Sequence, residues 1–127
     1  MLLVQTSPGE FLDKLTILEI KSERMSDPAK LANVRRELEL LRATWQASPL
    51  GARDVSALKT QLRAVNEALW EIEDRIREKE AAAAFDAEFV DLARSVYRTN
   101  DRRAAIKREL NVLLGSDLVE EKSYKPY

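Results

Sequence analysis

The sequence predicts an all-α fold, an antiparallel bundle of about four helices that ends in an irregular C-terminal tail. Between residues 55 and 76, apolar residues recur at alternating steps of three and four, which keeps one stripe of a helix facing a partner helix. Only 3 Gly and 4 Pro interrupt the 127 residues, and they fall between the periodic segments. Charged residues make up 34% of the chain, which suits helices with wide solvated faces. We expect a single domain over residues 1–127, long enough to bury a core without metals or disulfides.

The first helix is expected to span residues 8–26. The segment Ser7–Glu10 carries the pattern of a capping box, with a capping serine, a proline at the first helical position and a glutamate three residues after the serine. Apolar side chains of this helix point in almost every direction at about 100° per residue, so it should be the most buried helix. Its polar residues, among them Asp13 and Glu19, then need partners from other helices.

The remaining helices follow from the breaks between periodic segments. An aspartate–proline pair repeats the cap signal, so the second helix is expected over residues 28–47. A loop separates it from the long heptad helix at 54–82, and a short turn precedes the last helix at 86–114. Gly115 suits the left-handed conformation past a helix end. The pattern leaves open whether the first two helices fold back on one another or continue as a kinked rod.

Composition and charge exclude several classes of function. The chain balances 21 Lys and Arg against 22 Asp and Glu, so no overall field attracts nucleic acid or an anionic membrane. Cysteine and histidine are both absent, which removes thiolate chemistry, His-ligated metals and the commonest general base, and no cofactor is expected. The apolar start at residues 2–4 is too short for a signal peptide or a membrane span, so we expect the cytoplasm.

The main functional clue is an interruption in the apolar stripe of the last helix. On a helical wheel, Asn100, Arg103 and Lys107 occupy three consecutive inward positions. One interpretation is a buried ion-pair network in which Asp13 and Glu19 of the first helix neutralise the two cations. Such a network is common and needs no ligand.

The alternative interpretation is a pocket for a small anionic metabolite at the same three residues. The arginine would grip a carboxylate or phosphate in a bidentate fork, the lysine would add a point charge, and the asparagine would orient the ligand. Arg35 and Arg42, beside the stripe of the second helix, would add to the positive charge.

A row of carboxylates on the heptad helix suggests a weaker possibility. Glu71, Asp74 and Glu78 lie along one helix face, and hard cations bind such rows. The wheel places this face away from the partner helix, and neighbouring residues form ordinary i,i+4 ion pairs. A solvated face is therefore the preferred interpretation unless a second subunit covers it.

Three aromatic residues are candidates for an interface. Trp70 lies to the side of the heptad stripe, next to the acidic row, where it either packs internally or anchors a protein contact. Tyr124 and Tyr127 belong to a tail that is too polar to fold alone, and they could cover a groove.

Four segments resemble the signatures of a bacterial and phage-encoded all-helical domain family of unknown function. The segments are GEFLDKLTILEIK at 9–21, LWEIEDRIR at 69–77, YRTNDRRAAIK at 97–107 and VEEKSY at 119–124. The resemblance covers nearly the whole chain and implies a cytoplasmic all-helical protein. It implies no activity and no catalytic residues.

Three functions remain, in order of preference. The first is an interaction or assembly module that binds itself or another bacterial protein. The second is a binder of a small anion, or an enzyme that works by electrostatic positioning at the polar seam. The third is a divalent-metal phosphohydrolase that uses the acidic row. The first is preferred, and an enzyme is not favoured, because the residue types that carry most chemistry are missing.

Overall fold

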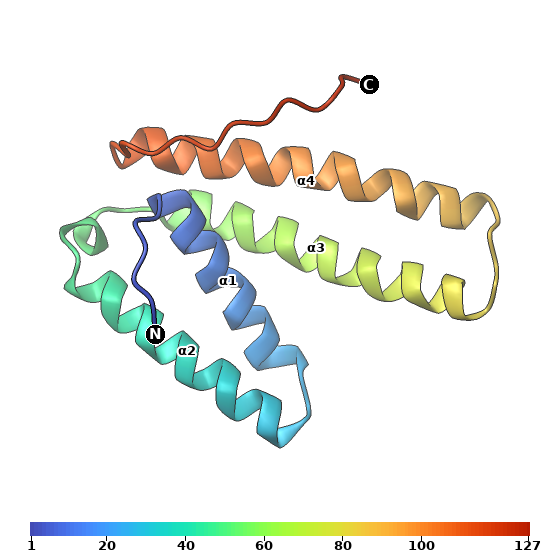
Figure 1. The fold of residues 1–127 in the computed structure, drawn as a ribbon, viewed down its shortest axis with the longest axis horizontal. Helices are drawn as coiled ribbons and strands as arrows, with labels where there is room; N and C mark the ends of the chain where they lie inside the picture. The colour runs from blue at the N-terminus through green and yellow to red at the C-terminus, as the bar shows by residue number, and fades with distance from the viewer.

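Four helices form two antiparallel hairpins in the computed structural model, which describes residues 1–127 (Figure 1). The helices are α1 (Pro8–Arg24), α2 (Pro28–Ala47), α3 (Ser56–Ala81) and α4 (Ala87–Leu113), and a 3-10 turn, η1 (Pro49–Ala52), follows α2. The prediction of an all-α four-helix fold is confirmed. The observed helix ends lie within two residues of the predicted ones, the usual uncertainty for fraying termini. None of the helices is both long and apolar enough to cross a membrane.

Helices α1 and α2 fold back on one another as an antiparallel hairpin and do not continue as a kinked rod. Asp27 caps α2 by accepting hydrogen bonds from the backbone of the first turn, and the chain reverses direction between Met25 and Asp27. At the start of α1, the Ser7 hydroxyl accepts from the Glu10 backbone N–H at 3.2 Å. The Glu10 side chain, however, contacts α4 instead of returning to close the capping box.

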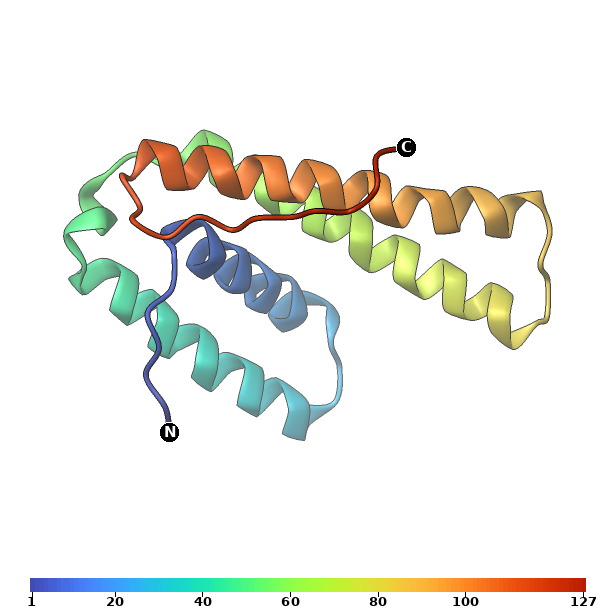
Figure 2. The same ribbon diagram turned by 45° about the horizontal axis from the view of Figure 1, so that its top comes forward.

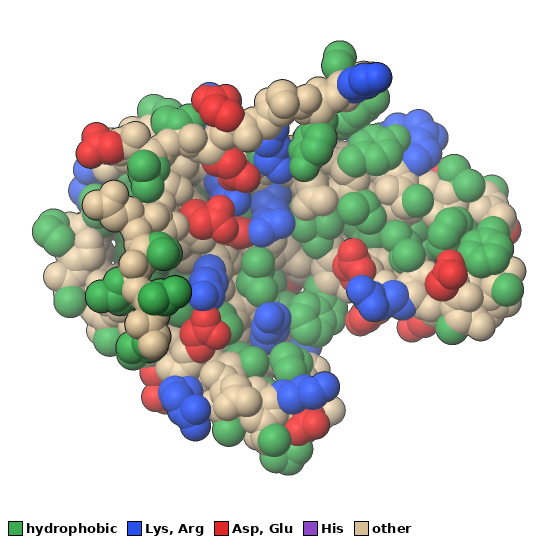
Figure 3. Space-filling view, in the orientation of Figure 1, with side chains coloured by type: hydrophobic (Ala, Val, Ile, Leu, Met, Phe, Trp, Pro, Cys, Tyr) green, Lys and Arg blue, Asp and Glu red, His purple; other side chains and the backbone are tan.

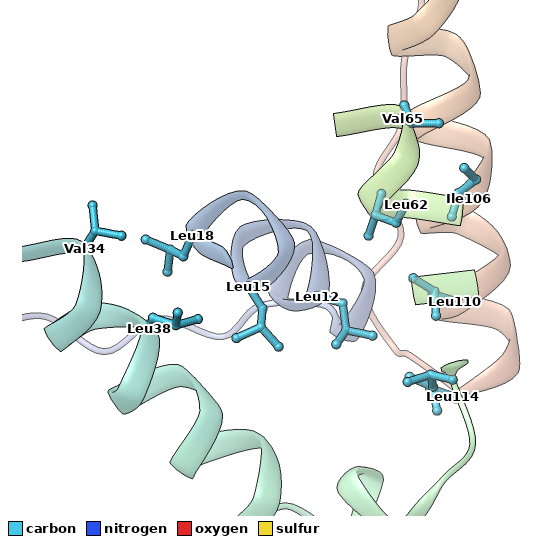
Figure 4. Packing of buried hydrophobic residues seen from close by; sticks show 11 residues of the cluster. Leu12, Leu15, Leu18, Val34, Leu38, Leu62, Val65, Ile106, Leu110 and Leu114 are labelled. Atoms are coloured by element: carbon cyan, nitrogen blue, oxygen red, sulfur yellow. The ribbon is translucent and has the colours of Figure 1, made fainter. Parts of the chain in front are cut away.

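The hydrophobic core extends from α2, across α1, to the base of the α3–α4 hairpin (Figure 4). It is one cluster of 11 buried residues, and Leu12, Leu62 and Leu110 are fully enclosed. Helix α1 packs against α2, α3 and α4, which makes it the central helix, as expected. Helix α2 packs only against α1 and η1, so the four helices do not close into a symmetric bundle.

Beyond this core, the α3–α4 hairpin projects as an arm, here residues 72–98 (Figures 1 and 2). Helices of 26 and 27 residues are about 40 Å long, which exceeds the reach of α1 and α2. Within the arm Leu92 is the only buried side chain, while Ile72 and Ile76 of the heptad stripe stay half-buried. The arm is therefore one pair of helices thick.

The C-terminal tail, residues 116–127, turns back and runs along α4 (Figures 1 and 2). Gly115 makes the reversal with φ of +65°, the left-handed conformation expected there. Ion pairs from Glu120 to Lys107 and from Glu121 to Arg108 fasten the tail to the helix. The tail thereby covers the middle of α4 instead of projecting into solvent.

Candidate functional site

The polar seam of α4 is paired with an aspartate at the centre of the protein. Asp13 on α1 is 1% exposed and faces Arg103, whose Nε donates to Oδ1 at 2.9 Å while Nη2 donates to Oδ2. This two-pronged geometry is the strongest form of an arginine–carboxylate contact. The hydrogen bond from Arg103 to Asp13 raises the pKa of the guanidinium, so the arginine stays charged.

Lys107 is 7% exposed and gathers three carboxylates around its ammonium group. Its Nζ lies 2.6 Å from Glu10 Oε2, 3.0 Å from Glu120 Oε2 and 4.0 Å from Asp13 Oδ2. Burial lowers the pKa of Lys107, but the hydrogen bonds to Glu10 and Glu120 outweigh it and the net pKa is raised. The lysine is therefore a buried, charged junction between α1, α4 and the tail.

Two further polar residues complete the coordination of Asp13. Asn66 on α3 donates from Nδ2 to Asp13 Oδ1 at 3.0 Å and lies 3.1 Å from Thr16 Oγ1. Thr16 donates its hydroxyl proton to the backbone carbonyl of Asp13 at 2.8 Å. Neither residue was expected in the site, although an asparagine directly after Val65 of the heptad stripe was a usable signal.

The start of α1 approaches α4 so closely that Asp13 and Glu10 reach Arg103 and Lys107. Gly9 donates its backbone N–H to Asn111 Oδ1 at 2.7 Å, and both residues are buried. A Cβ atom at Gly9 would lie 2.5 Å from the backbone carbonyl oxygen of Lys107. Only glycine allows this approach.

A polar cavity of about 220 Å³ lies beside these ion pairs, beneath the tail. Its lining consists of Glu10, Asn100, Arg103, Ala104, Lys107, Glu120 and Lys122. Acidic and basic side chains gather where α1, α4 and the tail meet, as the space-filling view shows (Figure 3). The third predicted seam residue, Asn100, is half-buried at this cavity. Glu120 and Lys122 enter the site from a segment that carries no helical periodicity.

Three of the residues expected near the seam lie elsewhere. Glu19 pairs with Lys59 at 3.0 Å and with Arg63 at 3.3 Å, in a separate network between α1 and α3. Arg35 and Arg42 are exposed on α2, which does not contact α4. The expectation that these arginines add charge to the seam is wrong, because the helix that carries them packs on the far side of α1.

Comparison with known sequences shows one relationship. Residues 2–127 match a family described as "Family of unknown function (DUF6165)". The chain belongs to the DUF6165 family. No curated protein and no solved structure matches it. Membership in DUF6165 confirms the resemblance to a family of unknown function and carries no activity over to this chain.

A second hollow in this DUF6165 protein lies on the opposite side of Arg103. It measures about 450 Å³ and opens between α1 and the base of the arm, where the half-buried Trp70 lines it together with Ile17 and Lys21. Arg103 lines both this groove and the polar cavity, so it separates the two. The predicted interface residue Trp70 thus forms part of a groove wall.

The acidic row stays on the outer face of α3 in the DUF6165 chain. Glu71, Asp74 and Glu78 are exposed, and Glu71 lies 3.3 Å from Arg24. No group of three or more acidic side chains in the chain comes close enough together to hold a metal ion. The geometry therefore gives no support to a phosphohydrolase that uses this row.

The two tyrosines of the tail have different surroundings. Tyr127 donates its hydroxyl proton to Asp101 and packs its ring 4.8 Å from that of Tyr97. This hydrogen bond raises the pKa of Tyr127. Tyr124 is exposed, and the Lys122 ammonium lies 5.7 Å from the centre of its ring. Tyr127 anchors the end of the tail, whereas Tyr124 remains available to solvent.

Acid is expected to release the tail of the DUF6165 chain from α4. The hydrogen bond from Lys107 lowers the pKa of Glu120 below its ordinary value of 4.5. A carboxylate with a lowered pKa stabilises the folded state above its ordinary pKa, and this stabilisation is lost as pH falls through the lowered value. NMR signals of residues 119–122 should therefore be constant from pH 7 to 5 and change below about pH 4.5. In Glu120→Gln the tail signals should already show the released state at pH 7, and an unchanged acid transition in this variant would contradict the assignment.

Proposed function

We propose that the protein is an assembly module in which the outer faces of the α3–α4 hairpin bind a second copy of the chain. The observation that carries this proposal is the thinness of the arm, where Leu92 is the only buried side chain. Phe85 and Val90 on the arm are 59% and 51% exposed, and Tyr97 is also exposed. Apolar side chains are visible over much of the arm in Figure 3. A projecting element with exposed apolar surface is typical of protein–protein contacts.

The hairpin also carries two charged rows that cannot pair with each other within one chain. The outer face of α3 holds Glu71, Asp74 and Glu78, and the outer face of α4 holds Arg94, Arg98 and Arg102; all six side chains are exposed. Both rows lie opposite the apolar seam that joins the helices, so they face away from each other. Apart from Glu71, none of the six makes an ion pair in the chain. At 1.5 Å per residue the rows extend about 10.5 Å and about 12 Å, so their lengths match.

A second copy can satisfy these rows if its α4 lies along α3 of the first. The acidic row then meets the arginine row, and Trp70 beside the first row approaches Val90 and Tyr97 beside the second. This contact joins different faces of the two copies, so each copy keeps one unused face. Complementary charge of this kind also makes association weaker as salt increases.

Charge reversal on the two rows tests the proposal. Arg98→Glu and Asp74→Arg are each expected to weaken self-association about tenfold or more, because each places like charges opposite one another. Mixing the two variants should restore a one-to-one pair, since the intact acidic row of the first meets the intact arginine row of the second. Sedimentation velocity at low and high salt measures the association of each variant alone and of the mixture.

The matched control is Arg36→Glu, a charge reversal at an exposed arginine on α2 that makes no ion pair in the chain. This variant should associate like the wild type. A wild-type chain that remains monomeric at high micromolar concentration and low salt would overturn the proposal. So would a mixture of Arg98→Glu and Asp74→Arg that forms no pair.

A further inference from the structure

We propose that the polar cavity beneath the tail is a binding site for a small anion with a phosphate or carboxylate group. The ligand would be held by Arg103 and Asn100 from α4 and by Lys122 from the tail. The inference is independent of self-assembly, because none of these residues belongs to the charged rows of the hairpin.

The first support is unused hydrogen-bonding capacity on three residues that line one cavity. Arg103 uses Nε and Nη2 on Asp13, which leaves Nη1 without an acceptor in the chain. The half-buried Asn100 amide makes no side-chain hydrogen bond, and the Lys122 ammonium has no carboxylate partner. All three residues line the same cavity. Donors left unpaired beside a cavity are what an anionic ligand would satisfy.

The second support is the chemistry and size of the cavity. Six of its seven lining residues are polar or charged, and Ala104 is the exception. Three cations and two carboxylates line it. Glu10 and Glu120 pair with Lys107, and Asp13 pairs with Arg103, so Lys122 is the cation of this site that has no carboxylate partner. The volume of about 220 Å³ is below that of typical drug-sized pockets, which favours a small ion over a nucleotide.

The arrangement of the carboxylates narrows the class of ligand further. Glu10 and Glu120 both lie on Lys107, so that lysine is already neutralised and the ligand's anionic group belongs nearer Lys122. A hydroxyl or ammonium group next to the anion could donate to Glu10 or Glu120. The favoured class is therefore a small phosphate ester or carboxylate that also carries a hydrogen-bond donor.

The site is complete only while the tail lies on α4. Lys122 is two residues after Glu120, whose contact with Lys107 at 3.0 Å holds that part of the tail in place. A ligand that bridges Lys122 and Arg103 would therefore stabilise the docked tail, and a docked tail would raise the affinity for the ligand. Inorganic phosphate should accordingly shift the NMR signals of residues 119–122.

The experiment uses inorganic phosphate and malonate as separate probes, titrated into the full chain at constant ionic strength by calorimetry and followed by NMR. We expect millimolar or tighter binding of at least one probe, and at least fivefold weaker binding in Lys122→Met. Lys125→Met is the matched control, because Lys125 is a lysine of the same tail that does not line this cavity. Asn100→Ala is a second test, and its amide makes no hydrogen bond on which folding depends.

Each outcome decides the proposal. Binding that is lost in Lys122→Met and kept in Lys125→Met supports it, and the stronger probe identifies the anionic group. Equal weakening in both lysine variants would mean a general attraction to a basic tail and would overturn the site. If neither phosphate nor malonate binds the wild-type chain, the proposed site is also overturned. That result would have no bearing on self-association.

Discussion

Asp13→Ala is expected to lower the free energy of unfolding by about 3–5 kcal/mol, the usual cost of breaking a buried ion pair. Asp13 is the shared acceptor of Arg103 and Asn66, and Lys107 lies 4.0 Å away. Without it, the half-buried guanidinium of Arg103 loses both of its acceptors, the Asn66 amide keeps only Thr16 as a partner, and the buried lysine loses one of its three acids. Urea-induced unfolding at pH 7, followed by circular dichroism, measures the loss.

Two controls are a variant that breaks a surface ion pair and a variant in which the three central charges are all replaced. Glu121→Ala removes the exposed partner of Arg108 and should change stability by no more than about 0.5 kcal/mol. Replacing the three central charges together, with Asp13→Leu, Arg103→Met and Lys107→Met, should recover part of the stability lost in Asp13→Ala, because no unpaired charge stays buried. A loss near 1 kcal/mol in Asp13→Ala would show that water reaches the pair.

Gly9→Ala is expected to destabilise the protein by about 2–4 kcal/mol, although alanine is the better helix former by about 1 kcal/mol. The added Cβ would lie 2.5 Å from the Lys107 carbonyl oxygen and 2.8 Å from Asn111 Oδ1. Helix α1 would have to move away from α4, which weakens the Gly9–Asn111 hydrogen bond and displaces Asp13 from Arg103. Thermal unfolding should show a lower melting temperature for Gly9→Ala than for the wild type.

Asn111→Ala separates the steric effect from the loss of the hydrogen bond. Alone it should cost about 1 kcal/mol, the typical value for one hydrogen bond. In that background Gly9→Ala should cost less than in the wild type, but not zero, because the backbone of Lys107 remains in the way. A higher melting temperature for Gly9→Ala in the otherwise wild-type protein would contradict the close approach of α1 and α4.

Most of the fold could be predicted from local signals. The heptad stripe of α3, the capping serine of α1 and Gly115 after α4 each act within a few residues, so helix ends and the all-α class could be predicted. The packing partner of each stripe could not, because an apolar face specifies burial and not the surface that buries it. The placement of α2 against α1 alone is an example.

The candidate site was predictable where the contact follows from a helical wheel. The inward position of Arg103 and the buried position of Asp13 both follow from periodicity. Glu19 is six residues after Asp13 and so points about 120° away from it, toward Lys59 and Arg63 instead of the seam. Glu120 lies in a segment with no periodicity, and its contact with Lys107 depends on a tail that reverses direction. No local pattern encodes such a long-range contact.

Because the core ends where α1 leaves the α3–α4 hairpin, the reach of the arm is independent of the stability of the body. Deleting one heptad from each helix would shorten the arm by about 10.5 Å and keep the seam in register. The Asp13 network and the polar cavity lie at the base and would be untouched, and the tail would keep its contacts if the deleted residues lie beyond Tyr97, on which Tyr127 packs. The hairpin thus behaves as a spacer of adjustable length, and changing it would move the tip of the arm relative to the body without redesigning either.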